Sequence, residues 1–271
     1  MQADPYSVRT GVYAVGYGGG AIEWLEMRHA AHHAAFFLPY LKSGMALLDC
    51  GCGSGSITVG LGEAVSPAPA LGIDLEPRVI RRANLRAKEQ GITNARFQVG
   101  SAYQLPFDSS SFDAVFAHAL LEHLGEPARA VQEMRRVLKP GGVIGLRSID
   151  VGGRIIYPTN DLLERYHYFF EAVLKRDGRD LRIGRRLGAL LRAEGFERVE
   201  ASASFDCHWG QKAVNAIAAA WIEFPFLDEA VALGMSDLIE VGEIRDAFRA
   251  WKESPDAFFA WSQCQAVGLK E

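Results

Sequence analysis

The chain has 271 residues, of which 49% are hydrophobic and 23% are charged, and its formal net charge is −4. This balance is typical of a globular protein with a sizeable core. The negative charge gives no electrostatic basis for binding a nucleic acid backbone. No apolar stretch approaches the roughly 20 residues that a membrane helix needs. We therefore expect neither a nucleic acid nor a membrane as a partner.

The N-terminal region and the cysteines indicate the cellular compartment of the protein. The first ten residues, MQADPYSVRT, lack the basic region and apolar core of a signal peptide. The four cysteines follow no zinc-binding spacing, since two form Cys-x-Cys and two are distant singles. Reduced thiols are the simplest interpretation, so we expect a cytoplasmic protein without a structural zinc site.

Residues 1–20 are rich in glycine and predict a flexible arm that contains Tyr17. From about residue 21 to residue 41 the pattern becomes helical. His29, His32 and His33 fall within it at the i, i+3, i+4 spacing of one helix face. No cysteine or acidic pair accompanies these histidines, so we expect a helix surface or the wall of a cleft there and no metal.

The next stretch, residues 45–62, predicts a strand followed by a glycine-rich turn and a helix. Further strands are expected at 69–74, 95–99, 112–117, 143–149 and 198–205, with a last, antiparallel strand at 257–269. Helices are expected at 76–90, 127–138, twice within 159–194, and across 209–254. This alternation predicts a doubly wound, mostly parallel, seven-stranded α/β sheet of Rossmann-like type with a helical lid. The expected regions are an arm and first helix at 1–44, a ligand-binding core at 45–150, and the end of the sheet with its helical cap at 151–271.

The turn after the first strand has the composition of a nucleotide site. Asp49 ends the strand, and Gly51, Gly53 and Gly55 follow at alternate positions. Glycine lets the backbone come close to a ligand, and the start of the next helix points free N–H groups into the same space. Asp74 lies about 20 residues further on, where an acid can accept hydrogen bonds from ribose hydroxyls. The spacing is G-x-G-x-G and not the G-x-G-x-x-G of dinucleotide sites, which disfavours a nicotinamide-dependent oxidoreductase.

The order of the later motifs is more specific. It runs Asp-Cys-Gly-Cys-Gly-Ser-Gly at 49–55, Gly-Ile-Asp at 72–74, Gly-Ser-Ala at 100–102, Phe-Asp-Ala-Val-Phe-Ala-His at 112–118 and Arg-Val-Leu-Lys-Pro-Gly-Gly at 136–142. This series resembles the class I S-adenosylmethionine-dependent methyltransferases. Within them it is similar to the group that includes the ubiquinone/menaquinone-biosynthesis C-methyltransferases. The resemblance covers residues 40–150 closely, and the remainder only in layout.

The resemblance implies a role for each matching residue in binding S-adenosylmethionine, whose product is S-adenosylhomocysteine. Asp49, Gly51 and Gly53 would hold the methionine end, Asp74 the ribose and Leu75 the adenine face. The remaining residues with an implied or possible part in the site are Ser101 and Ala102 at the adenine edge, Ala117 and His118 over the methionine, and Tyr17 over its carboxylate. Family members usually have Asp where this chain has Ser101, which weakens that contact.

The implied reaction is the direct displacement of a methyl group onto a small, apolar or aromatic acceptor through O, N, S or C. Proximity and orientation supply most of the catalysis, so a general base is optional. If one is used, His118 is the first candidate and His208 the second, because imidazole titrates near neutral pH. A methyltransferase for RNA or protein, a catalytically silent cofactor-binding protein and a nicotinamide-dependent oxidoreductase stay open as alternatives. We expect a monomer or a homodimer.

Overall fold

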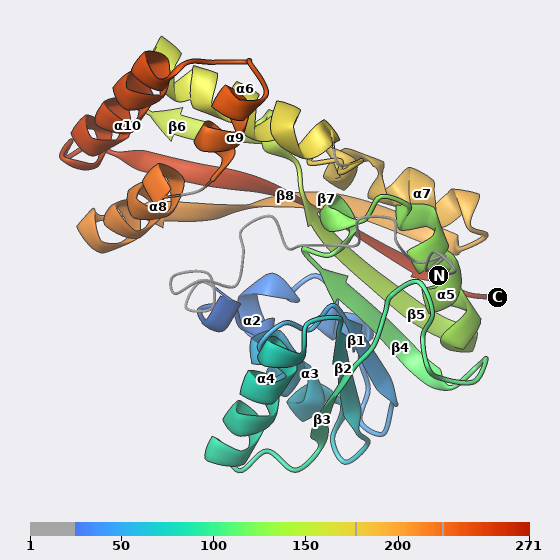
Figure 1. Cartoon of the computed structure of the whole chain (residues 1–271). Helices are drawn as coiled ribbons and strands as arrows, with labels where there is room; N and C mark the ends of the chain where they lie inside the picture. Colours follow the sequence, from blue (N-terminus) through green and yellow to red (C-terminus); the bar gives the residue numbers. More distant parts are fainter. Residues whose placement is uncertain (1–24, 177, 224) are drawn as a thin grey trace, which may run out of the picture.

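A single mixed sheet organises the molecule, shown in Figure 1 as a computed structural model that describes residues 25–176, 178–223 and 225–271. Its strands are β1 (Leu47–Cys50), β2 (Ala70–Asp74), β3 (Ala95–Val99), β4 (Phe112–His118), β5 (Leu138–Ile149), β6 (Ile155–Tyr157), β7 (Glu197–Trp209) and β8 (Phe258–Leu269). The order is β3-β2-β1-β4-β5-β8-β6, and β7 pairs with β8. The first five strands are parallel, and β8 runs antiparallel to its neighbours. The expected fold class is confirmed, with the short β6 as an eighth strand.

Helices cover the sheet and extend beyond one end of it (Figure 1). They are α2 (Ala30–His33), α3 (Ser56–Val65), α4 (Pro77–Glu89), α5 (Pro127–Val137), α6 (Asp161–Arg176), α7 (Leu187–Ala193), α8 (Gln211–Glu223), α9 (Phe226–Ala232) and α10 (Leu238–Lys252). Short 3-10 turns are η1 (Leu38–Tyr40), η2 (Leu121–His123), η3 (Val151–Gly153) and η4 (Ile183–Arg186). None of the helices in the described ranges is long and apolar enough to cross a membrane.

Two sequence-based expectations about elements are wrong. The helical pattern over residues 21–41 gives, in its described part, mainly the short α2 and η1, because His29 is extended (φ −151°, ψ 152°) and Pro39 lies within η1. The strand expected at 143–149 begins earlier, because residues 138–142 are part of β5 as well. Its backbone pairs with the end of the chain, since Gly141 N–H donates to Lys270 O (2.6 Å).

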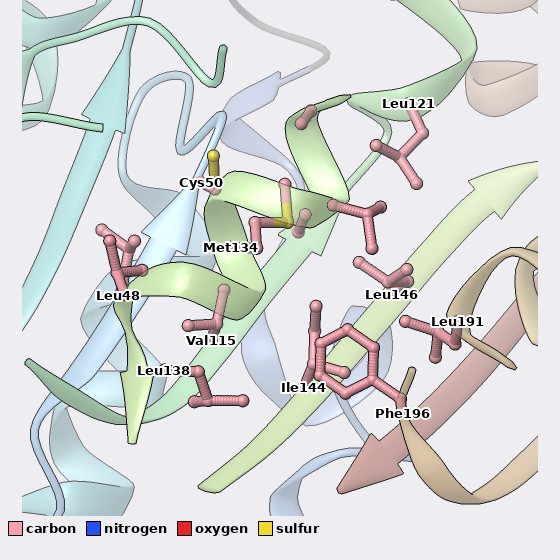
Figure 2. Packing of buried hydrophobic residues seen from close by; sticks show 14 of the residues in the cluster. Leu48, Cys50, Val115, Leu121, Met134, Leu138, Ile144, Leu146, Leu191 and Phe196 are labelled. Atoms are coloured by element: carbon pink, nitrogen blue, oxygen red, sulfur yellow. The ribbon is translucent and has the colours of Figure 1, made fainter. Parts of the chain in front are cut away.

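Successive strand residues pack on opposite faces of the sheet. On one face, Leu48, Val115 and Ile144 pack with Met134 of α5 and Leu191 of α7 (Figure 2). The other face is covered by α3 and the segment that contains α2 and η1, through the cluster of Leu47, Leu61, Phe37, Phe116 and Val143. The parallel strands are therefore buried on both sides, and their carboxyl ends form one edge.

The cap, which we define as α6, α8, α9 and α10, has an apolar core of its own. Its buried members include Trp221, Phe226, Phe248 and Trp251, which pack with Phe259 of β8. Figure 1 shows these helices gathered around the end of the β7–β8 ribbon that carries β6. The aromatic content of the second half of the chain thus builds a folded cap over the extended part of the sheet.

Candidate functional site

The glycine loop connects β1 to α3 at the carboxyl edge of the sheet. The N–H groups of Gly51 and Cys52 both donate to Ile73 O of β2 (2.8 and 2.9 Å). Gly53 has φ +53°, and a Cβ there would lie 3.6 Å from Leu25 Cδ1, which is ordinary contact, so glycine is required there for backbone conformation. Gly55 has φ +74°, and a Cβ there would lie 2.6 Å from Phe97 Cζ, so it is also required for packing. The loop presents backbone without side chains at this edge.

Asp49 lies beneath the loop and has an exposed fraction of only 2%. Thr58 of α3 donates its hydroxyl to Asp49 Oδ2 (2.6 Å). Burial raises the pKa of Asp49 to about 7, against the opposing effect of the Thr58 hydrogen bond. Asp49 therefore ties β1 to α3 and places a titratable carboxyl group directly under the loop.

Asp74, the last residue of β2, fastens the other side of the loop. Its Oδ2 accepts from Gly53 N–H (3.0 Å), and its Oδ1 accepts from Glu76 N–H (3.0 Å). Burial raises the pKa of Asp74, although these hydrogen bonds oppose the shift. The next residue, Leu75, is 51% exposed, so a large apolar side chain stands in solvent beside the carboxylate. An acid with spare acceptor capacity next to an apolar surface suits a sugar joined to an aromatic base.

Ser101 and Ala102 follow β3, which pairs with β2 through Asp74 and Val99. The Ser101 hydroxyl accepts from Tyr103 N–H (3.2 Å), and Ala102 packs against the main core. The structure thus brings Ser101 and Asp74 to neighbouring strand ends. The Ser101 hydroxyl contributes to its own turn.

His118 closes β4 and is only 5% exposed, and the neighbouring Ala117 is 2% exposed. Arg147 Nη1 lies 2.6 Å from His118 Nε2. Because a guanidinium only donates hydrogen bonds, Nε2 must be the acceptor and Nδ1 carries the proton. His118 Nδ1 has no hydrogen-bond partner among the described residues. Burial, and then the charges of Arg28 and Arg147, keep the pKa of His118 well below its usual value.

This geometry argues against the sequence-based hypothesis that His118 is the general base. A neutral imidazole whose Nε2 is occupied and whose Nδ1 is already protonated is a hydrogen-bond donor at Nδ1. The second candidate, His208, lies near the end of β7 and stacks on Phe259 (ring centroids 6.2 Å apart). Burial also lowers the pKa of His208. Tyr17 lies outside the described residues.

The polar network behind His118 was not predicted from the sequence. Arg147 is fully buried and pairs with Asp206 of β7 through Nη2–Oδ1 (2.6 Å) and Nη1–Oδ2 (3.2 Å). His32 Nε2 also lies 2.9 Å from Asp206 Oδ1, and the ring of His33 lies 5.3 Å from that of His118. The one available signal was a charged residue within the apolar strand predicted at 143–149.

The ligand atoms of His32, His33 and Asp206 lie within 4.8 Å of one another, a spacing that a metal ion could use. Both oxygens of Asp206, however, accept from the buried Arg147 guanidinium. That arrangement identifies Asp206 as the counter-ion of Arg147. The network instead joins the segment that carries α2 to β4, β5 and β7.

The family follows from the match of residues 41–179 to the model of a methyltransferase domain. The chain belongs to the methyltransferase domain family. A probable methyltransferase of Aspergillus luteorubrus, ltbC, is 30% identical over 97% of this chain and 98% of its own length. The demethylmenaquinone methyltransferase of Geobacillus stearothermophilus is 30% identical over 51% of this chain and 64% of its own. These relatives confirm the resemblance inferred from the motifs.

A solved structure of this methyltransferase fold extends over nearly the whole chain. Haemonchus contortus phosphoethanolamine N-methyltransferase 2, in complex with phosphomonomethylethanolamine and S-adenosylhomocysteine, superposes with a TM-score of 0.59 and 17% identity. The superposition covers 97% of this chain and 58% of that one. At this identity the match shows a common fold.

Proposed function

We propose that the chain transfers a methyl group from S-adenosylmethionine to a small, apolar or aromatic molecule. Asp74 carries this proposal. Its two oxygens each accept one backbone hydrogen bond, which leaves lone pairs for two further donors such as a ribose diol. Gly51 and Gly53 would admit the methionine part, and the exposed Leu75 would cover the adenine.

Two buried polar atoms beside the loop support the same ligand. The hydroxyl of Ser54, a residue that is 1% exposed, and Nδ1 of His118 both have no hydrogen-bond partner in the described part of the chain. Buried polar atoms in native proteins are nearly always hydrogen-bonded, so each suggests a ligand. The residues present therefore fit a ligand with polar groups at the glycine loop and at the end of β4.

The bound cofactor would supply a methyl group attached to a sulfonium, from which a neutral thioether departs readily. The chain's own part is to exclude water, hold the acceptor in line and stabilise its orientation. We assign His118 Nδ1–H to orienting, as a neutral donor to the acceptor or to the methionine end. For an acceptor that must lose a proton, His208 remains the candidate base, with a lowered pKa that limits its strength.

The net charge of −4 disfavours RNA as the acceptor, and the aromatic cap favours an apolar small molecule. The test is transfer of a labelled methyl group from S-adenosylmethionine to a panel of hydroxylated aromatic molecules, amines and thiols, with total RNA and denatured protein as competing substrates. We expect label only in small molecules. Label confined to RNA or protein contradicts the proposed acceptor class, and no label in any substrate contradicts the proposed activity.

A further inference from the structure

The core of the cap contains polar atoms that an apolar core does not need. Tyr166 and His167 of α6 are 1% and 4% exposed. The Tyr166 hydroxyl and both ring nitrogens of His167 have no hydrogen-bond partner among the described residues. A buried polar atom without a partner destabilises the folded state, so three on consecutive residues require a reason.

Aromatic rings surround these atoms. The His167 ring lies 5.3 Å from Trp221 and 6.0 Å from both Phe259 and Trp261, measured between centroids. The Tyr166 and His167 rings are 5.3 Å apart and nearly perpendicular. Burial keeps His167 neutral by lowering its pKa, so the imidazole offers one donor and one acceptor. The surroundings therefore suit a neutral aromatic molecule that both donates and accepts.

Gln263 continues this site toward the centre of the sheet. Phe259, Trp261 and Gln263 alternate along β8 and so share one face. Gln263 is 7% exposed, and its Oε1 also has no partner in the described ranges. Trp261 is only partly buried, so the edge of the aromatic cluster near Gln263 is accessible.

The register of the sheet connects this site with His118. His118 pairs with Arg147, Arg147 pairs with Gln265, and Gln263 lies two residues along the same strand. Two strand spacings and one two-residue step separate the His118 and Gln263 backbones by roughly 12 Å. An aromatic molecule of two or three rings spans that distance between the side chains.

We propose that Tyr166, His167 and Gln263 form the polar end of the acceptor site and bind a hydroxyl group of a neutral, multi-ring aromatic molecule. The acceptor atom would then lie at the opposite end, beside His118. The placement of the acceptor atom beside His118 rests on the proposed function. The binding site itself is testable with a ligand that needs no cofactor.

The probes are 2-naphthol and naphthalene, which differ by one hydroxyl group. Their binding is measured by saturation-transfer NMR with and without S-adenosylhomocysteine, for the wild type, His167→Phe and Tyr166→Phe. Tyr168→Phe is the matched control, because Tyr168 is on the same helix and is 55% exposed. Melting temperatures are recorded for every variant.

We expect the wild type to prefer 2-naphthol, and His167→Phe to lose about five- to tenfold of that preference, the value of one neutral hydrogen bond. Tyr166→Phe should lose part of the preference while melting at the same or a higher temperature, because the unpaired hydroxyl is gone. Tyr168→Phe should match the wild type.

Equal binding of both probes to the wild type, or an unchanged preference in His167→Phe, overturns the inference. A higher melting temperature of Tyr166→Phe with unchanged probe binding also overturns the inference. Loss of S-adenosylhomocysteine binding with an intact probe preference would instead contradict the proposed function alone.

Discussion

Removal of the Asp206 carboxylate should destabilise the fold strongly. Asp206 neutralises Arg147, whose side chain has an exposed fraction of 0%. Among the described residues, the guanidinium in Asp206→Ala keeps His118 Nε2 and the Ser204 hydroxyl (3.5 Å), neither of them charged. Breaking a buried ion pair on one side costs about 3–5 kcal/mol, so we expect the free energy of unfolding to fall by that amount. Urea denaturation monitored by circular dichroism measures it.

Two comparison variants separate the buried charge from general damage. The double variant Arg147→Met, Asp206→Leu removes both charges and should be more stable than Asp206→Ala alone, because no isolated cation stays buried. Asp246→Ala breaks the exposed pair with Arg249 and should leave stability unchanged within error. A loss below about 1 kcal/mol in Asp206→Ala, or a double variant less stable than the single one, would refute the reasoning.

Two further predictions concern the glycine loop. Asp49 has its pKa raised from 3.8 to about 7, so the folded state holds that proton more tightly and stability falls as the pH rises from about 4 to about 7. The free energy of unfolding should fall by about 4 kcal/mol over this pH range. Asp49→Asn should lack this pH dependence in urea titrations between pH 4 and pH 8. Parallel pH profiles for the wild type and the variant would contradict the prediction. Gly55→Ala adds a Cβ 2.6 Å from Phe97 at φ +74° and should cost roughly 2–4 kcal/mol. Gly91→Ala, at φ +65° in open space, should cost only about 1–2 kcal/mol, and equal losses in urea denaturation would rule out the steric explanation.

The sequence was sufficient to predict where the glycine loop and the two acids beside it lie, because their positions depend on local pattern. Asp49, the glycines and Asp74 lie at strand ends, and apolar runs bounded by glycine mark such ends well. Parallel strands align their carboxyl ends, so local predictions also placed these residues together. The same reasoning predicted the bounds of β7 and β8 to within a few residues, since both strands have long stretches in which apolar residues alternate with polar ones or follow one another.

The polar network behind His118 could not be predicted from local sequence pattern. His32 and Asp206 are 174 positions apart, and only the antiparallel addition of β7 next to β8 brings Asp206 to Arg147. The histidine spacing predicted a helix face, but the extended backbone at His29 leaves a single turn of helix there. Tertiary contacts, such as Phe37 against Gly145, fix that segment more than helix propensity does.

The binding of S-adenosylhomocysteine, measured by isothermal titration calorimetry, tests the central claim most directly. Asp74→Ala removes the carboxylate proposed to bind the ribose. Glu76→Ala is the matched control, because the Glu76 side chain caps α4 through Arg78 N–H (2.9 Å) and pairs with the Arg78 guanidinium (4.0 Å). We expect saturable binding to the wild type, a Kd raised roughly 100-fold in Asp74→Ala for two hydrogen bonds to a charged group, and a change within about twofold in Glu76→Ala. No binding to the wild type, or equal affinity in Asp74→Ala, would contradict the proposed cofactor site.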